Sequence, residues 1–259
     1  AIGAGLTYQW RNGLVNLVNS AIISGATSSV LTINPASAAD NSANYNVVVN
    51  GTYLPGVISI NAGLLVATAA SLTAQPGNQT VCVGATSVFS VQATGTNLTY
   101  QWRKGLVNLN NGGSVTGATS PILTINPVSL LDAAANYNCV ITNLCAVTLT
   151  SNTASLIVNS PPSISSQPAN LILCEGTTAS FSVTAAGSAL TYQWRKGLVN
   201  LTNGANISGA TTSVITISSI AIGDAGTDYN VVVSGACLPS ETSIQASLVV
   251  NTSPSITTQ

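Results

Sequence analysis

The chain has 259 residues, of which only 4% are charged, and its formal net charge is −1. A protein that binds nucleic acid or an anionic membrane through charge needs clustered Lys and Arg, so this composition excludes both kinds of partner. Histidine is absent, which excludes Ser-His-Asp and Cys-His catalytic arrangements. Hydrophobic residues make up 46% of the chain, which is enough to build folded cores.

The most apolar window covers residues 57–72, where Ser, Asn, Gly and Thr interrupt the apolar run. It is shorter than the about 20 residues that a membrane-spanning helix needs, so we expect no direct membrane span in this segment. The chain begins at Ala1 with no signal-peptide pattern. We therefore expect an internal fragment of a longer protein.

A Tyr-Gln-Trp-Arg motif recurs at a spacing of 92 residues, and it carries all of the tryptophans in the chain. Laying residue n over residue n+92 aligns nearly the whole sequence, which is the signature of an internal repeat. The first repeat lacks its opening stretch, and we expect the parent protein to supply the missing strands. The predicted layout is a partial repeat at residues 1–68, whole repeats at residues 69–159 and 160–251, and the start of another at residues 252–259.

Short alternating stretches predict β-strands within each repeat. Residues 180–184 alternate polar and apolar side chains, and residues 123–125 and 215–217 alternate with β-branched side chains. Asn-Gly turns at residues 111–113 and 203–204 separate such stretches. The predicted fold class is all-β, with tandem antiparallel β-sandwiches that repeat every 92 residues.

The order of these landmarks resembles the immunoglobulin fold. A strand with a tryptophan precedes a Leu-Thr-Ile strand, an Asp-x-x-x-x-Tyr corner and a valine-rich strand. The resemblance implies that the tryptophans pack between two sheets and that the tyrosines form the corner before the sixth strand. The core residues predicted in this way are Trp10, Trp102, Trp194, Tyr45, Tyr137 and Tyr229.

Longer stretches are similar to a particular bacterial group of repeats. They are Leu-Thr-Tyr-Gln-Trp-Arg-Lys at residues 98–104, Ile-Ser-Gly-Ala-Thr at residues 207–211 and Asp-Ala-Gly-Thr-Asp-Tyr-Asn-Val-Val-Val-Ser-Gly at residues 224–235. They resemble the tandem immunoglobulin-like repeats of large cell-surface and secreted proteins of Bacteroidota, including adhesins of gliding species that use type IX secretion. The resemblance implies an extracellular location at the bacterial cell surface.

The cysteines can be compared through the repeat. Cys82 overlies Cys174 and Cys145 overlies Cys237, with 63 residues between the members of each pair. We predict the disulfides Cys82–Cys145 and Cys174–Cys237, each within one repeat, which indicates an oxidising compartment. Cys139 stands at a valine position and is expected to be a buried core thiol. The spacing of the cysteines does not suit a metal site.

Candidate catalytic acids are few. Asp224 and Asp228 form the closest carboxylate pair, but Asn44 and Asn136 replace the second acid in the other repeats. A glycosidase needs two carboxylates across a cleft, so we interpret the aspartate before the tyrosine as a turn cap, with a calcium ligand as the alternative. We predict no enzyme activity, no cofactor and no metal site.

The basic residues are the candidate contact groups. Side chains alternate along a strand, so if Trp102 points inward, Gln101 and Arg103 face outward. Arg11 and Arg195 recur at the position of Arg103. One interpretation is a solvated strand face that protects a sheet edge. The other is a weak contact for an anionic or carbohydrate surface, strengthened by repetition.

The leading hypothesis is a non-catalytic structural or adhesive stalk segment of a large repetitive surface protein or filament. Each repeat would contact mainly the neighbouring repeats of the same chain, and the partners outside the chain would be surface glycans or other surface proteins. The alternative is a spacer or carbohydrate-binding-type module of a secreted multidomain hydrolase. The fold by itself does not decide between them.

Overall fold

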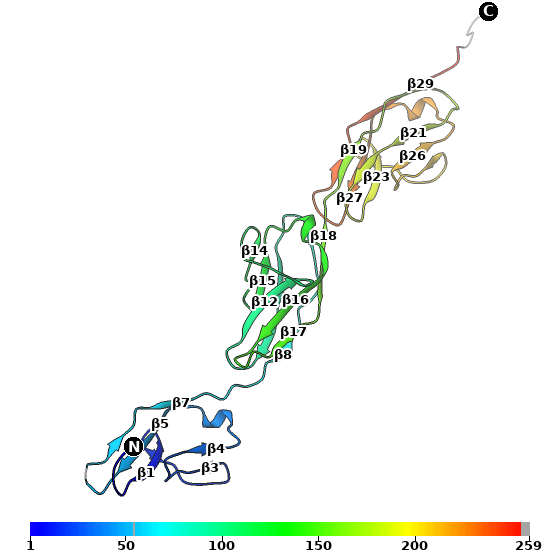
Figure 1. Ribbon diagram of the computed structural model, residues 1–259. Helices are drawn as coiled ribbons and strands as arrows, with labels where there is room; N and C mark the ends of the chain where they lie inside the picture. Colours follow the sequence, from blue (N-terminus) through cyan, green and yellow to red (C-terminus); the bar gives the residue numbers. More distant parts are fainter. Residues whose placement is uncertain (54, 255–259) are drawn as a thin grey trace, which may run out of the picture. The chain divides into compact units, whose positions relative to one another are not determined.

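The computed structural model describes residues 1–53 and 55–254, and nearly all of its regular structure is β-strand (Figure 1). This confirms the predicted all-β class. Short 3₁₀ turns precede the longest strand of each repeat: η1 (Ala38–Asp40), η2 (Leu130–Asp132) and η3 (Ile222–Asp224). The predicted start of another repeat falls partly outside the described residues, because residues 255–259 are not among them.

Contacts divide the chain into two compact units. The first unit comprises Ala1–Gln75, Val91–Tyr100 and Val140–Ser151. The second comprises Pro76–Ser90, Gln101–Cys139 and Asn152–Gln259. These units do not follow the predicted repeat boundaries, which stay a prediction.

The first repeat forms one sheet in the order β2-β1-β5-β6, in which β7 also pairs with β5, and a separate hairpin of β3 and β4. All of these pairings are antiparallel. The strands are β1 (Thr7–Asn12), β2 (Val15–Asn16), β3 (Ile23–Ser24), β4 (Thr32–Ile33), β5 (Ser42–Asn50), β6 (Val57–Ile58) and β7 (Ala62–Leu64).

The second repeat has a sheet in the order β13-β12-β16-β18-β9, with β17 also paired to β16, and a smaller sheet in the order β10-β15-β14. Strand β11 pairs with β8. The strands are β8 (Ser71–Ala74), β9 (Gln79–Cys82), β10 (Ser87–Ser90), β11 (Gln92–Thr94), β12 (Thr99–Lys104), β13 (Val107–Asn108), β14 (Val115–Thr116), β15 (Ile122–Ile125), β16 (Ala134–Thr142), β17 (Thr148–Thr150) and β18 (Ala154–Asn159).

The third repeat repeats this topology, with sheets in the orders β20-β29-β27-β23-β24 and β21-β26-β25. Strand β28 pairs with β27, and β19 pairs with β22. The strands are β19 (Ser163–Ser166), β20 (Leu171–Cys174), β21 (Ala179–Ser182), β22 (Thr184–Ala186), β23 (Thr191–Lys196), β24 (Val199–Asn200), β25 (Ile207–Ser208), β26 (Val214–Ile217), β27 (Gly226–Ser234), β28 (Glu241–Thr242) and β29 (Ala246–Asn251).

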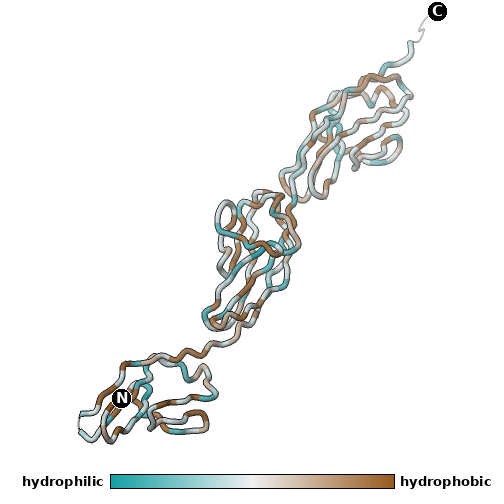
Figure 2. Tube along the Cα trace, viewed as in Figure 1, coloured by the Kyte–Doolittle hydropathy of each residue, from teal (hydrophilic) through white to brown (hydrophobic). Residues whose placement is uncertain are grey.

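The core of the third repeat lies between its two sheets. Alternate residues of β21 and β29 are buried, because successive side chains on a strand point to opposite faces. Hydrophilic and hydrophobic residues are interspersed along the trace (Figure 2). Phe181 comes from one sheet and stacks on Tyr229 of the other at a centroid distance of 5.0 Å. Trp194 is fully buried beside Phe181, and its Nε1 donates to the carbonyl of Thr212 at 2.9 Å.

The first repeat has the same tryptophan and tyrosine but a more open core. Trp10 is only half-buried, whereas Trp102 and Trp194 are fully buried. A hollow of about 290 Å³ lies against Trp10 and Tyr45, and β4 and β7 contribute to its walls. In the other repeats Phe89 and Phe181 contact the equivalent aromatic rings. The described residues of the first repeat include no counterpart of the strand that carries this phenylalanine.

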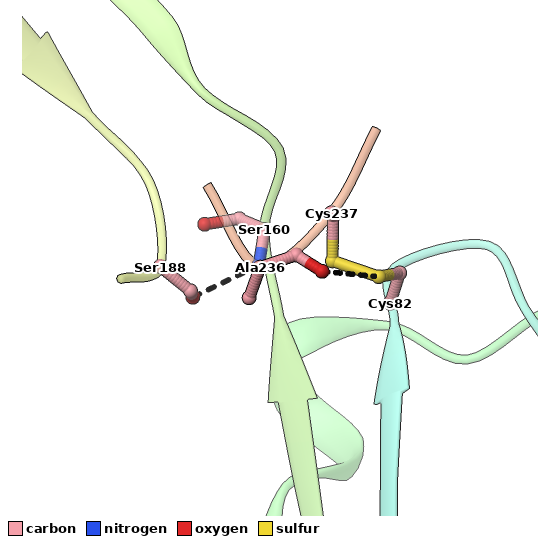
Figure 3. Close-up of a disulfide and its surroundings, with 5 residues drawn as sticks. All are labelled: Cys82, Ser160, Ser188, Ala236 and Cys237. Atoms are coloured by element: carbon pink, nitrogen blue, oxygen red, sulfur yellow. Dashed lines mark hydrogen bonds between the residues drawn. A yellow bond between two sulfur atoms is a disulfide. The ribbon is translucent and has the colours of Figure 1, made fainter. Parts of the chain in front are cut away.

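The disulfide prediction is wrong in its pairing. The structure joins Cys82 to Cys237, with a Cα–Cα distance of 5.9 Å (Figure 3), while Cys145 and Cys174 are exposed thiols. The bond therefore connects the second repeat to the third. The predicted bonds Cys82–Cys145 and Cys174–Cys237 do not form.

Strand register explains why the predicted bonds cannot form. In the third repeat β20 runs parallel to β29, with Cys174 opposite Asn251 at what we define as the C-terminal pole, the end where β29 finishes. Strand β27 is antiparallel to β29, so its first residues lie near the C-terminal pole. It spans nine residues, and a rise of about 3.4 Å per residue puts its two ends about 27 Å apart. Cys237 lies three residues after the other end of β27, at the opposite end of the repeat, which we call the N-terminal pole. A disulfide needs Cα atoms within about 7 Å.

The second repeat has the same registers. Cys82 lies opposite Asn159 at the end of β18, and β16 runs antiparallel to β18. Cys145 lies three residues after Thr142, the last residue of β16. The two cysteines of a repeat therefore lie at opposite poles, and the 92-residue register could not show this because it compares positions between repeats, not within one.

Candidate functional site

The Tyr-Gln-Trp-Arg motif runs directly into a tight β-hairpin in every repeat. In the second repeat β12 pairs with β13, with Lys104 opposite Val107. Gly105 makes the turn at φ 63°, a conformation that favours glycine. The next two side chains, Leu106 and Val107, are 92% and 71% exposed. We call Leu106 and Val107, with their equivalents in the other repeats, the hairpin tip.

The hairpin tip of the second repeat is anchored to the neighbouring strand β16. The amide of Gly105 donates to the carbonyl of Asn136 at 2.9 Å, and Nδ2 of Asn138 donates to the carbonyl of Gly105 at 2.9 Å. Asn138 is buried, so this bond is shielded from water. The exposed leucine and valine are therefore presented on a fixed turn.

The same anchor recurs in the other repeats. The turn glycine donates to the strand that follows the 3₁₀ turn, at 2.9 Å in both the first and the third repeat. The buried Asn46 and Asn230 donate through Nδ2 to the carbonyl of the turn glycine, at 3.1 Å in the first repeat and 3.0 Å in the third. The exposed tip residues are Leu14 and Val15 in the first repeat, Leu106 and Val107 in the second, and Leu198 and Val199 in the third.

Gln101, one of the predicted contact residues, has a structural role. Its Nε2 donates to the carbonyls of Trp102 and Leu109, both at 2.8 Å, and its side chain is half-buried. These bonds brace the base of the hairpin. Gln9 and Gln193 make the equivalent pairs of bonds.

The predicted arginines lie on the outer face of the same sheet and are half-buried. Nε of Arg103 donates to Oδ1 of Asn108 at 2.8 Å, and Nε of Arg195 donates to Oδ1 of Asn200 at 2.9 Å. Arg11 differs, because its Nε is buried and finds no acceptor in the described part of the chain. The guanidinium groups therefore flank the hairpin, and the tip beyond them is apolar.

The lysines of the second and third repeats serve the 3₁₀ turns. Nζ of Lys104 donates to the carbonyl of Leu131 at 2.7 Å and lies 6.0 Å from the centre of the Tyr137 ring. Nζ of Lys196 donates to the carbonyl of Gly223 at 3.1 Å and lies 5.5 Å from the centre of the Tyr229 ring. A cation at the end of such a turn satisfies its last carbonyl groups.

The aspartate before each core tyrosine closes the 3₁₀ turn. Oδ2 of Asp132 accepts hydrogen bonds from the amide and the hydroxyl of Ser129, at 2.7 Å and 2.8 Å. The hydroxyl of Tyr137 donates to the carbonyl of Asp132 at 2.6 Å, and burial raises the pKa of Tyr137 to about 12, with a further contribution from the charge of Asp132. Asp40 and Asp224 occupy equivalent positions and bond Tyr45 and Tyr229 in the same way.

The same carboxylates were the candidate metal ligands and catalytic acids. Within residues 1–53 and 55–254, no group of three or more His, Cys, Asp and Glu side chains could hold a metal ion. Cys139 is buried in the core, and burial raises the pKa of its thiol to about 11, which disfavours the reactive thiolate.

The hairpin tip is the feature that sequence reasoning missed. The contact residues predicted from the motif are its glutamine and arginine, and the leucine and valine of the tip are not among them. The sequence does carry a signal for the tip. Gly-Leu-Val lies between two stretches of alternating polar and apolar residues, and its adjacent leucine and valine break that alternation. Apolar side chains in a two-strand turn, recurring in every repeat, predict an exposed apolar site.

Comparison with solved structures identifies the architecture. A fragment of the titin I-band superposes with a TM-score of 0.71 at 16% identity, covering 95% of this chain and 88% of that one. The fold is that of tandem immunoglobulin domains. Immunoglobulin domains 1–4 of Sidekick-1 give a TM-score of 0.57 at 20% identity, covering 95% of this chain and 68% of theirs.

A third similar structure is the N-terminal eight immunoglobulin domains of Down Syndrome Cell Adhesion Molecule. The TM-score is 0.54 at 17% identity, and the match covers 95% of this chain and 33% of that one. Identities this low show the fold alone. The superpositions confirm the predicted tandem immunoglobulin-like sandwiches. No protein-family model and no curated protein matches the sequence.

Among the helical segments that the structure describes, none has the length and apolar character needed to span a membrane.

Proposed function

We propose that this chain is a non-catalytic structural and adhesive segment of a large repetitive protein at the bacterial cell surface. Its repeats space the binding regions of that protein outside the cell. The similarity of the motif stretches to repeats of Bacteroidota surface proteins, including gliding adhesins exported by type IX secretion, supports this location. Disulfide formation also suits an oxidising, extracellular compartment.

The observation that carries the adhesive role is the recurrence of the hairpin tip. Leu14, Leu106 and Leu198 are each at least 90% exposed, and each sits on a turn held by the same hydrogen bonds. Exposed apolar side chains on a preformed turn lose little conformational entropy when a partner covers them. Each leucine that becomes covered contributes about 1.5–3 kcal/mol. Recurrence then turns a weak contact into a strong one by avidity.

The roles of the polar side chains support a structural function. The carboxylates of Asp40, Asp132 and Asp224 accept hydrogen bonds from the backbone amides that open the 3₁₀ turns. Lys104 and Lys196 bond carbonyls of the same turns in the second and third repeats. Groups that elsewhere act as acids and bases are here part of the framework of each sandwich.

A bead-adhesion assay tests this function. Beads that carry the full chain are placed under flow over an apolar surface of alkylated glass, and their retention is measured. The variant Leu14→Ser, Leu106→Ser, Leu198→Ser changes every hairpin tip. We expect its retention to fall at least tenfold, because about 1.4 kcal/mol at a single site already gives a factor of ten.

The matched control changes three other exposed apolar residues, Ile60→Ser, Leu131→Ser and Leu238→Ser, which are 91%, 87% and 84% exposed. Its retention should stay close to that of the unmodified chain. Equal losses in both variants would show that general surface hydrophobicity, and not the hairpin tip, causes adhesion. Unchanged retention in the tip variant would refute the adhesive role.

A further inference from the structure

Two cysteines are exposed thiols although their counterparts in the 92-residue register form a disulfide. Cys174 corresponds to Cys82, and Cys145 corresponds to Cys237. The Cys82–Cys237 bond links the C-terminal pole of the second repeat to the N-terminal pole of the third. Each exposed thiol therefore occupies a position that is one half of a bond already present in the chain.

The surroundings of Cys174 match those of Cys82. Each cysteine ends a strand that runs parallel to the last strand of its repeat, opposite Asn251 and Asn159, respectively. The amide that follows each cysteine donates to the carbonyl of that asparagine, at 2.9 Å in both repeats. Both strand ends are thus fixed at the point where the chain leaves the repeat.

The loop that carries Cys237 is tied to the same point of the chain. The amide before Cys237 donates to the carbonyl of Ser188 at 2.8 Å, and the amide of Ser188 donates to the carbonyl of Ser160 at 3.1 Å. The amide of Ser160 donates back to the Ser188 hydroxyl at 3.1 Å (Figure 3). Since Ser160 directly follows Asn159, this short stretch brings Cys82 and Cys237 together.

The loop that carries Cys145 is built in the same way. The amide of Leu144 donates to the carbonyl of Thr96 at 3.1 Å, and the amide of Thr96 donates to the carbonyl of Thr68 at 3.4 Å. The amide of Thr68 donates back to the Thr96 hydroxyl at 2.9 Å. Thr68 and Thr252 both occupy the position of Ser160 in the 92-residue register. The stretch that follows each of the three repeats therefore begins with a residue that carries a hydroxyl group.

We infer that one disulfide joins each pair of consecutive repeats, from the strand-end cysteine of one repeat to the loop cysteine of the next. Cys174 is the half-site for such a bond with a further repeat that follows it in the same chain. Cys145 is the loop half-site, and the strand-end position that would pair with it, 92 residues before Cys82, lies outside the given sequence. Each bond forms when the two thiols lose one proton each and two electrons pass to a small-molecule disulfide, such as oxidised glutathione, which leaves as two thiols. This inference does not depend on the adhesive role.

An extended chain tests the inference. A second copy of residues 160–251 is inserted after Asn251 of the full chain, which offers Cys174 a loop cysteine in the same register. The protein is folded with oxidised glutathione and its disulfides are mapped without reduction. We expect Cys174 joined to the copied Cys237, and Cys82 still joined to the original Cys237. The control carries Ser in place of the copied Cys237, and its Cys174 should react fully with a maleimide reagent.

The unmodified chain provides a second measurement that does not need the insertion to fold. Native maleimide labelling should reach Cys145 and Cys174 and should spare Cys82 and Cys237. Either of two results would overturn the inference. One is a bond between cysteines of the same repeat in the unmodified chain. The other is a Cys174 that labels as strongly in the folded extended chain as in its control.

Discussion

The ring of Phe89 lies stacked on the ring of Tyr137, with their centroids 4.9 Å apart. Phe89 comes from β10 in one sheet and Tyr137 from β16 in the other, so the contact closes the sandwich. Trp102 lies against the same phenylalanine at 6.1 Å. Three aromatic side chains that are far apart in the sequence therefore meet at the centre of the second repeat.

Replacing the central phenylalanine should strongly destabilise this repeat. Phe89 is 1% exposed, so Phe89→Ala loses its burial and leaves a cavity, at a cost of about 3–5 kcal/mol. Val88 is its neighbour on β10 and is 44% exposed, so Val88→Ala should cost less than about 1 kcal/mol. Urea unfolding followed by tryptophan fluorescence measures both. Similar midpoints for the two variants would contradict the central role of Phe89.

The first repeat should open more readily than the third. The amides of Trp10 and Trp194 make the same hydrogen bond, to Ala26 at 2.8 Å and to Ala210 at 2.9 Å. Trp10, however, borders the hollow of about 290 Å³ and is only half-buried. Because the motif around both tryptophans is the same, their intrinsic exchange rates are matched. Hydrogen exchange should therefore be faster at Trp10, and equal rates would show that the hollow does not weaken the repeat.

Alkaline pH should destabilise the second and third repeats through their buried tyrosines. Burial raises the pKa of Tyr137 and of Tyr229 to about 12 from an ordinary value of 10.0. The folded state thus holds the phenolic proton more tightly than the unfolded state. The resulting stability is fully present below pH 10 and is lost as the pH rises toward 12, by about 2–3 kcal/mol for each tyrosine.

Melting temperature measured across this range tests the effect. The two tyrosines should leave the melting temperature unchanged just below pH 10 and lower it steadily above pH 10. Tyr229→Phe removes one ionisable group together with its hydrogen bond to Asp224, so the variant should be less stable at neutral pH but fall less steeply above pH 10. A parallel decline in both proteins would exclude Tyr229 as a cause.

The sandwich could be predicted from the sequence because burial follows simple rules. Alternation along a strand places Phe89 and Trp102 inward, and the 92-residue register shows which positions share a role in every repeat. The disulfide could not be predicted in this way. Whether Cys82 can reach Cys145 depends on the direction of β9 relative to β16, and parallel or antiparallel pairing leaves no mark in the spacing of cysteines.

The candidate site was predicted only in part, for a related reason. Alternation places Gln101 and Arg103 on the outer face, but it does not say that the Gln101 amide folds back onto the carbonyl of Leu109. Hydrogen-bonding groups close to a turn find partners that depend on the three-dimensional path of the hairpin. The exposed Leu106 and Val107 follow from the same turn geometry.

The brace made by Gln101 leads to a prediction that separates structure from binding. Gln101→Ala removes both hydrogen bonds, and the carbonyl of Leu109 loses its donor, so we expect a loss of about 1–3 kcal/mol in unfolding free energy. Bead adhesion by the folded variant should change little, because the hairpin tip remains exposed.

Arg103→Ala is the matched comparison, since Arg103 lies two residues along the same strand and donates a hydrogen bond to the side chain of Asn108 at the surface. Its effect on stability should be below about 1 kcal/mol. Thermal unfolding and the bead assay, applied to both variants, give a clear contrast. A Gln101→Ala protein that keeps its stability but loses adhesion would show that the glutamine is a contact residue, as the sequence first indicated, and that the brace is dispensable.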